Sequence, residues 1–107
     1  MTQFIGIDWV FGRPSNGADQ EEERAIRAAE AVLDAFCWRA GQPEPIDYID
    51  AEAAYARHMS DEVYNRSERD TKLIAAWEAA EKAANLALTD GWHNPNGAGC
   101  SIRAYSV

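Results

Sequence analysis

At 107 residues, the chain is long enough for one compact domain and too short for two that each bury a core, so we expect residues 1–107 to form a single domain. Hydrophobic residues make up 47% of the sequence and charged residues 26%, which are values of ordinary globular proteins and exclude wholesale disorder. The formal net charge of -8 argues against direct binding to nucleic-acid phosphates and favours a basic protein partner.

The sequence also bears on the cellular compartment. It contains neither the roughly 20 consecutive apolar residues of a membrane helix nor a secretion signal at its N-terminus. Cys37 and Cys100 are two thiols far apart, too few for a disulfide-stabilised secreted scaffold. We therefore expect a cytoplasmic protein with reduced, mainly structural cysteines, no membrane association and no cofactor.

The first predicted element is a strand over residues 4–11. Alternate residues from Ile5 onward are large and apolar, which gives this strand one apolar face. The Gly, Pro, Ser and Asn residues at positions 12–17 suit turns and predict a loop after it.

A long helix follows. Asp19 suits the N-cap position, Glu22 stands three residues later, and Gly41 with Pro43 ends the helix near residue 40. The apolar residues between these signals recur at three- and four-residue steps and form one stripe, which consists of Ile26, Ala29, Leu33, Phe36 and Ala40.

A shorter helix is predicted to begin near Asp47 or Asp50, with Tyr48, Tyr55 and Met59 on one face. Because Ser60 resembles an N-cap, residues 61–66 form either a short separate helix or an irregular bridge. Both alternatives stay open.

The other long helix is predicted from residue 68, after a possible N-cap at Ser67, to a terminating Gly91. Its apolar face consists of Leu73, Trp77, Ala80, Ala84 and Leu88. A turn-rich loop at residues 91–99 leads to a second strand over residues 100–107.

These elements predict an α+β fold that is predominantly helical, with two long helices, a shorter helical segment and a small sheet from the N- and C-terminal strands. The direction of strand pairing stays open. A sheet of two strands is marginal alone, so we expect that either the helices cover it or a partner adds a strand to its edge.

One short motif points to metal chemistry. Residues 5–8, Ile-Gly-Ile-Asp, resemble the first strand of RNase H-like nucleases and actin-like ATPases, and the resemblance implies a metal-binding role for Asp8. These families turn the chain after the aspartate, whereas Trp9, Val10 and Phe11 prolong the strand here. The other interpretation is an outward-facing Asp8 that discourages unwanted strand pairing.

The residues Cys37, His58, His93 and Cys100 are of the types that bind zinc, but no two of them have the close spacing of a ligand pair. We find no catalytic motif either, so the sequence assigns no metal site and no catalytic residue. A small metal-binding protein or enzyme built on Asp8, His58, His93 and Cys100 is retained as one alternative.

The acidic residues are the most distinctive candidates for function. Carboxylates on the first long helix are expected on the side away from its apolar stripe, where they could contact Lys or Arg of a partner. The other interpretation is a solvated helix surface with local Glu–Arg and Glu–Lys pairs. The predicted partner-binding residues are Glu21, Glu22, Glu23, Glu30, Asp34, Asp61 and Glu62, with Trp38 and Trp92 as aromatic anchors.

In size, charge and absence of motifs, the chain is similar to small inhibitors encoded by phages and mobile elements, such as anti-CRISPR proteins and DNA mimics. The similarity implies a non-enzymatic protein that binds and inhibits a basic, nucleic-acid-binding protein or nucleoprotein complex. The main alternative is a structural module that forms a homodimer through a terminal strand.

Overall fold

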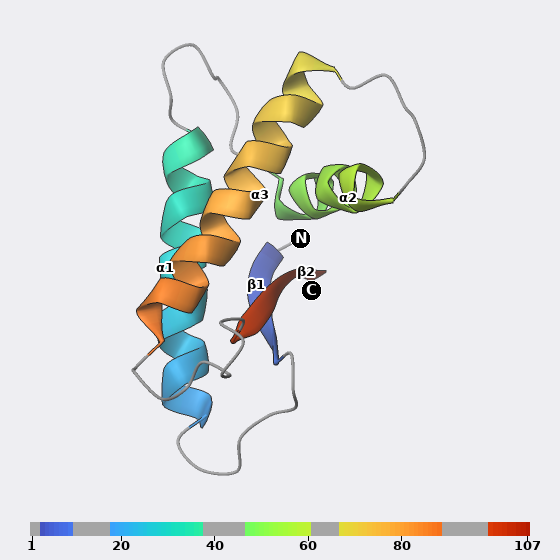
Figure 1. Ribbon diagram of the computed structural model, residues 1–107. Helices are drawn as coiled ribbons and strands as arrows, with labels where there is room; N and C mark the ends of the chain where they lie inside the picture. The colour runs from blue at the N-terminus through green and yellow to red at the C-terminus, as the bar shows by residue number, and fades with distance from the viewer. Residues whose placement is uncertain (1–2, 10–17, 38–46, 61–66, 89–98) are drawn as a thin grey trace.

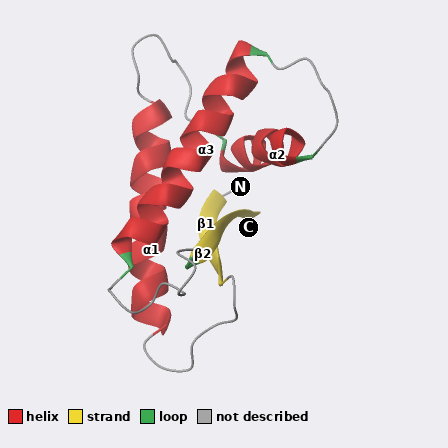
Figure 2. Cartoon of the chain, in the orientation of Figure 1, coloured by secondary structure: helices red, strands yellow, loops and turns green. Residues whose placement is uncertain are grey.

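The computed structural model describes residues 3–9, 18–37, 47–60, 67–88 and 99–107. Within this part of the chain the elements are, in order, β1 (Gln3–Trp9), α1 (Ala18–Cys37), α2 (Tyr48–Met59), α3 (Glu68–Ala87) and β2 (Cys100–Ser106) (Figure 1). Figure 2 shows the segregation of helices and strands, which confirms the predicted α+β class with its two long helices and one shorter helix. Among the described residues, no helix is both long and apolar enough to cross a membrane.

The helices cover one face of the sheet. α1 and α3 lie side by side, the two strands lie along this helix pair, and α2 crosses near the end of the sheet where both chain termini lie (Figure 1). The strands pair in antiparallel fashion, in a register that runs from Gln3 opposite Ser106 to Trp9 opposite Cys100. The sequence left this direction open.

Alternate strand residues point into the helix layer. Ile5, Cys100 and Ile102 are buried, while Ile7 and Trp9 are half-buried against the same core. This confirms the predicted apolar face of the first strand.

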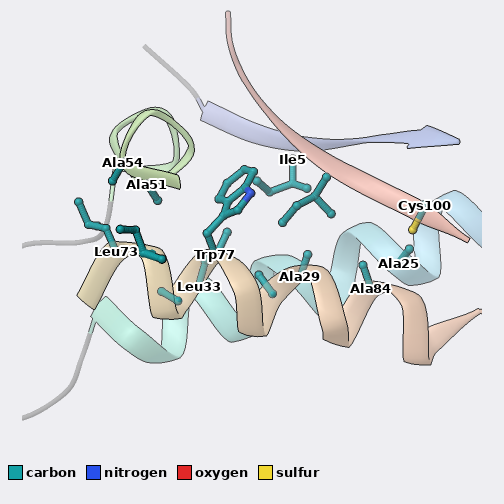
Figure 3. Close-up of a cluster of buried hydrophobic side chains, with 14 of the residues drawn as sticks. Ile5, Ala25, Ala29, Leu33, Ala51, Ala54, Leu73, Trp77, Ala84 and Cys100 are labelled. Atoms are coloured by element: carbon teal, nitrogen blue, oxygen red, sulfur yellow. The ribbon is translucent and has the colours of Figure 1, made fainter. Parts of the chain in front are cut away.

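The core combines a few large side chains with many alanines. Trp77, Ile5 and Leu33 are the largest fully buried side chains, and Figure 3 shows Trp77 and Ile5 between the helices and the sheet. The distance between packed helices depends on the side chains at their contact, so the small alanines bring the helices close together. The buried alanines are Ala25, Ala29, Ala51, Ala54, Ala76, Ala80 and Ala84.

The observed start of α1 corrects one prediction. The helix begins at Ala18, so Asp19 lies in its first turn instead of at the N-cap. The buried row also differs from the predicted stripe: it contains Ala25 as well as Ala29 and Leu33, whereas Ile26 is half-buried at its border. The predicted helix end at residues 38–41 lies outside the described residues.

α2 begins where the sequence predicted. Its N-cap is Asp47, whose side chain accepts a hydrogen bond from the amide of Asp50 at 3.0 Å. The predicted face is wrong at Met59, which is 62% exposed, because Ala51 and Ala54 are the residues that α2 buries against α3.

α3 follows its predicted pattern closely. Ser67 is the N-cap and accepts from the amide of Asp70, and all five predicted core residues of this helix are buried. Ser60, predicted as a possible N-cap, is the C-cap of α2, and residues 61–66, predicted as a short helix or an irregular bridge, lie outside the described residues. α3 ends at Ala87, before the predicted terminator at residue 91, because Leu88 leaves the helix in an extended conformation and enters the core.

Candidate interaction surfaces

The carboxylates at the start of α1 are not a uniform exposed patch. Glu21 is only 5% exposed, with Arg24 Nη1 at 3.6 Å from its Oε2, so the prediction of an exposed Glu21 is wrong. Glu21 is buried because it stands one helical turn before the buried Ala25, and residues four positions apart lie on the same face of a helix. Glu23 is exposed, and Arg27 on the next turn forms an ion pair with it.

A shallow depression of about 450 Å³ lies over the first two turns of α1. Its described lining residues carry both signs of charge and all belong to this helix, so they favour no particular ligand. The lining residues are Gln20, Glu21, Glu23, Arg24 and Arg27.

Glu22 and Glu30 bind groups of β1. Glu22 Oε1 accepts from the indole Nε1 of Trp9 at 2.7 Å, and Glu30 Oε2 accepts from the backbone amide of Ile5 at 3.4 Å. Both carboxylates therefore attach α1 to the neighbouring strand. Sequence reasoning missed this role because it requires the strand to be placed beside the helix.

Asp34 is exposed, and its Oδ1 accepts from the hydroxyl of Tyr48 at 2.7 Å, which links α1 to the start of α2. The remaining predicted partner-binding residues lie outside the described part of the chain, and these are Trp38, Asp61, Glu62 and Trp92.

The free edge of β2 is bound by side chains of the helices. Asn85 Oδ1 accepts from the amides of Gly99 at 3.1 Å and Cys100 at 2.9 Å, while its Nδ2 donates to the carbonyl of Cys100 at 2.9 Å. Nδ2 also donates to the carbonyl of Glu81 one turn earlier. The side-chain amide of Asn85 thus pairs with Cys100 much as a residue of a third strand would.

Two carboxylates continue this row along β2. Glu81 accepts from the amide of Ile102, and Glu52 Oε2 on α2 accepts from the amide of Ala104 at 2.9 Å. Four residues of α3 span ~6 Å and two residues of a strand span ~6.7 Å, so successive turns of the helix match successive outward amides of the strand. The outward amides at positions 100, 102 and 104 are therefore all bound.

These edge carboxylates bind main-chain amides and not cations of the described residues. Glu30, Glu52 and Glu81 bind neutral main-chain amides, and none of the three belongs to an ion pair formed among the described residues. Burial raises the pKa of Glu81, the amide of Ile102 opposes this shift, and the charge of Glu78 adds to it. Helix carboxylates that form no ion pair with any described residue thus border both edges of the sheet.

The outer face of the sheet carries an exposed aromatic pair. The rings of Phe4 and Tyr105 stack with centroids 5.3 Å apart and planes at 19°, and the two residues are 39% and 46% exposed. Gly6 lies against the Tyr105 ring, since a Cβ at this position would collide with Tyr105 Cε2. In the sequence, Phe4 and Tyr105 alternate with the apolar residues that face the core, so the period-two pattern places both on the outer face. The sequence prediction did not select them.

Asp8 lies on this outer face as well. Its carboxylate is 3.5 Å from Arg103 Nε on the neighbouring strand, and both side chains are more than half exposed. Asp8 is thus outward-facing, as in the second interpretation given above.

The residues of the metal or enzyme alternative lie in separate surroundings. His58 Nε2 is 3.6 Å from Glu78 Oε1 between α2 and α3, whereas Cys100 is buried on the inner face of the sheet, opposite to Asp8. Burial, with a contribution from Glu81, raises the pKa of Cys100 to about 11, which disfavours a reactive thiolate. Among the described residues, no three His, Cys, Asp or Glu side chains are arranged to hold a metal ion, and His93 lies outside them.

No protein-family model matches this chain, and no curated protein or solved structure matches it. Its function is therefore inferred from its own residues.

Proposed function

We propose that this protein is a small non-catalytic binding protein that recognises and blocks a basic surface of a nucleic-acid-binding protein. The observation that supports this function is negative charge that the fold does not neutralise. The chain has a net charge of -8, and the carboxylates Glu30, Glu52 and Glu81 are held by neutral amides of its own strands.

The exposed ion pairs do not weaken this argument. The pairs of Glu23 with Arg27 and of Glu68 with Lys72 connect residues four positions apart on one helix, and such surface pairs contribute little energy. A partner with Lys or Arg side chains competes readily for such carboxylates. At physiological salt the field of surface charges extends about 8 Å, so a basic surface is attracted and a nucleic-acid phosphate is repelled.

The experiment is a pull-down from a bacterial lysate with the immobilised protein, eluted in steps of rising salt and followed by mass spectrometry. We expect a nucleic-acid-binding protein that is released as salt rises. Capture of no protein, or capture of neutral proteins that salt does not release, would contradict the proposal.

Charge variants sharpen this test. Glu23→Lys and Glu68→Lys each reverse an exposed charge that is held only by a local ion pair, and both should weaken capture and flatten its salt dependence. Lys72→Glu is the matched control, because it makes the same helix more acidic and should strengthen capture. Equal capture by all of these variants would show that charge does not drive binding.

A further inference from the structure

The sheet offers a partner its outer face and not its β2 edge. A strand that paired with β2 would have to displace Asn85, Glu81 and Glu52 from amides that they already bind. On β1, the outward amide of Ile5 is bound by Glu30. A homodimer that extends the sheet through β2 would have to break the same contacts.

The exposed aromatic residues of the outer face lie at the end of the sheet where Gln3 pairs with Ser106. Phe4 and Tyr105 stack there with more than a third of each residue exposed. Stacked aromatic rings with open faces are the surfaces to which Arg and Lys side chains bind through cation–π interactions. Arg103 and Asp8 complete the face and neutralise each other.

Two carboxylates that form no ion pair among the described residues bind the two edges of the sheet, at the residue pair next to the aromatic pair. Phe4 is paired with Tyr105 in the sheet, and the adjacent pair is Ile5 with Ala104. Glu30 binds the amide of Ile5 at one edge, and Glu52 binds the amide of Ala104 at the other. Because neighbouring strands are only ~4.8 Å apart, the two carboxylates bind a narrow sheet from its opposite edges.

We propose that an extended basic segment of the partner binds across the outer face, with an Arg or Lys side chain stacked on Phe4 and Tyr105 between Glu30 and Glu52. This inference rests on the proposed function, because it assigns the surface on which the basic partner is recognised. The occupant is a segment of another protein and not a second copy of this chain. The outer face of two seven-residue strands measures ~23 Å by ~10 Å, an area well below the ~800 Å² that each partner buries in a stable interface. Two copies that each carry a net charge of -8 also repel each other.

The test is a titration of the ¹⁵N-labelled protein, followed by amide chemical shifts, with an oligo-arginine peptide and with an uncharged oligo-glutamine peptide of equal length. We expect oligo-arginine to shift the amides of Phe4, Gly6, Arg103 and Tyr105 in a salt-dependent way, and oligo-glutamine to shift none of them. Shifts confined to α1 and α3 would overturn the assignment of this face.

Three variants locate the binding energy. Tyr105→Ala should weaken oligo-arginine binding roughly tenfold, since an aromatic contact of this size is lost. Gly6→Ala should weaken it as well, because the new Cβ displaces the ring and leaves its chemistry intact. Leu86→Ala is the matched control, as Leu86 is an apolar residue of α3 that is 72% exposed, and it should leave binding unchanged.

The outcomes separate this inference from the proposed function. If binding depends on salt but neither Tyr105→Ala nor Gly6→Ala weakens it, the sheet face is not the binding surface. A basic partner would then bind another surface of the protein. No binding of oligo-arginine to the unmodified protein would count against both. Shifts of Phe4 and Tyr105 that depend on protein concentration without peptide would show a second copy on this face and would also overturn the inference. Circular dichroism of each variant verifies the fold, and Phe4→Leu serves as a second probe if Tyr105→Ala unfolds.

Discussion

Asn85 connects the end of α3 to the start of β2, and its replacement tests whether this connection holds the sheet on the helices. The variant Asn85→Ala removes the partners of three backbone groups, namely the amides of Gly99 and Cys100 and the carbonyl of Cys100. Gly99 and Cys100 are both buried. The groups are therefore left largely without water when the side chain is truncated.

The expected cost follows from these three groups. An unsatisfied buried polar group costs ~1–3 kcal/mol, and the lower value applies because Asn85 is half-buried and water enters beside it. We expect a loss of about 3 kcal/mol from a total stability of about 5–15 kcal/mol. For a slope of about 1.5 kcal/mol per molar, the urea midpoint should fall by about 2 M.

The assay is urea unfolding followed by tryptophan fluorescence and by far-ultraviolet circular dichroism. Leu86→Ala at the next, exposed position should change the free energy of unfolding by less than about 0.5 kcal/mol. A loss below about 1 kcal/mol for Asn85→Ala would refute the reasoning. Asn85→Asp keeps the acceptors and loses the donor, so it should also destabilise the protein, and less so at acidic pH, where the carboxyl regains a proton to donate.

Three further predictions concern the core and its titratable groups. The pKa of Glu81 is raised on folding, so its contribution to stability is complete below its unfolded pKa and is lost as pH rises through the folded pKa. The free energy of unfolding of Glu81→Gln should therefore increase relative to that of the unmodified protein as pH rises from acidic to neutral. A difference in urea unfolding that stays constant with pH would contradict this. Cys100, with a pKa of about 11, should resist iodoacetamide at neutral pH until urea unfolds the protein, and rapid modification of the folded state by mass spectrometry would refute its burial. Trp77→Ala should lower the free energy of unfolding, measured by calorimetry or urea unfolding, by about 3–5 kcal/mol. Met59→Ala, at an exposed position, should lower it by less than about 0.5 kcal/mol. Similar values for both variants would contradict the burial of Trp77 in the core.

Much of the fold was predictable from local periodicity. The buried face of α3, including Leu73 and Trp77, follows the three- and four-residue spacing of its apolar residues, and the cap at Ser67 was visible as a side chain that accepts from the first turn. Where periodicity was ambiguous, as at Met59, the small Ala51 and Ala54 decided which side of α2 faces α3. Alanine is only weakly hydrophobic, so a hydrophobic pattern in the sequence does not identify the alanines that will be buried. Their burial follows from the close packing of the helices.

The acidic residues show the limit of such reasoning. Glu21, Glu22 and Glu23 are consecutive and alike in sequence, yet the first is buried, the second binds the Trp9 indole, and the third is exposed. Consecutive helix positions differ by about 100° in direction, so the placement of the helix against its neighbours assigns each carboxylate a different environment.

The sequence by itself determined the charge of this protein, the type and order of its described helices and strands, and the apolar faces of β1 and α3. Only the tertiary structure decided that β1 and β2 pair in antiparallel fashion, that helix carboxylates and Asn85 bind the outward amides of Cys100, Ile102 and Ala104, and that Phe4 stacks on Tyr105 from the other end of the chain. The physical reason is that a repeat of apolar residues is a local property. The hydrogen-bonding needs of a strand edge, and the neighbours of an outward side chain, exist only after distant segments have been brought together.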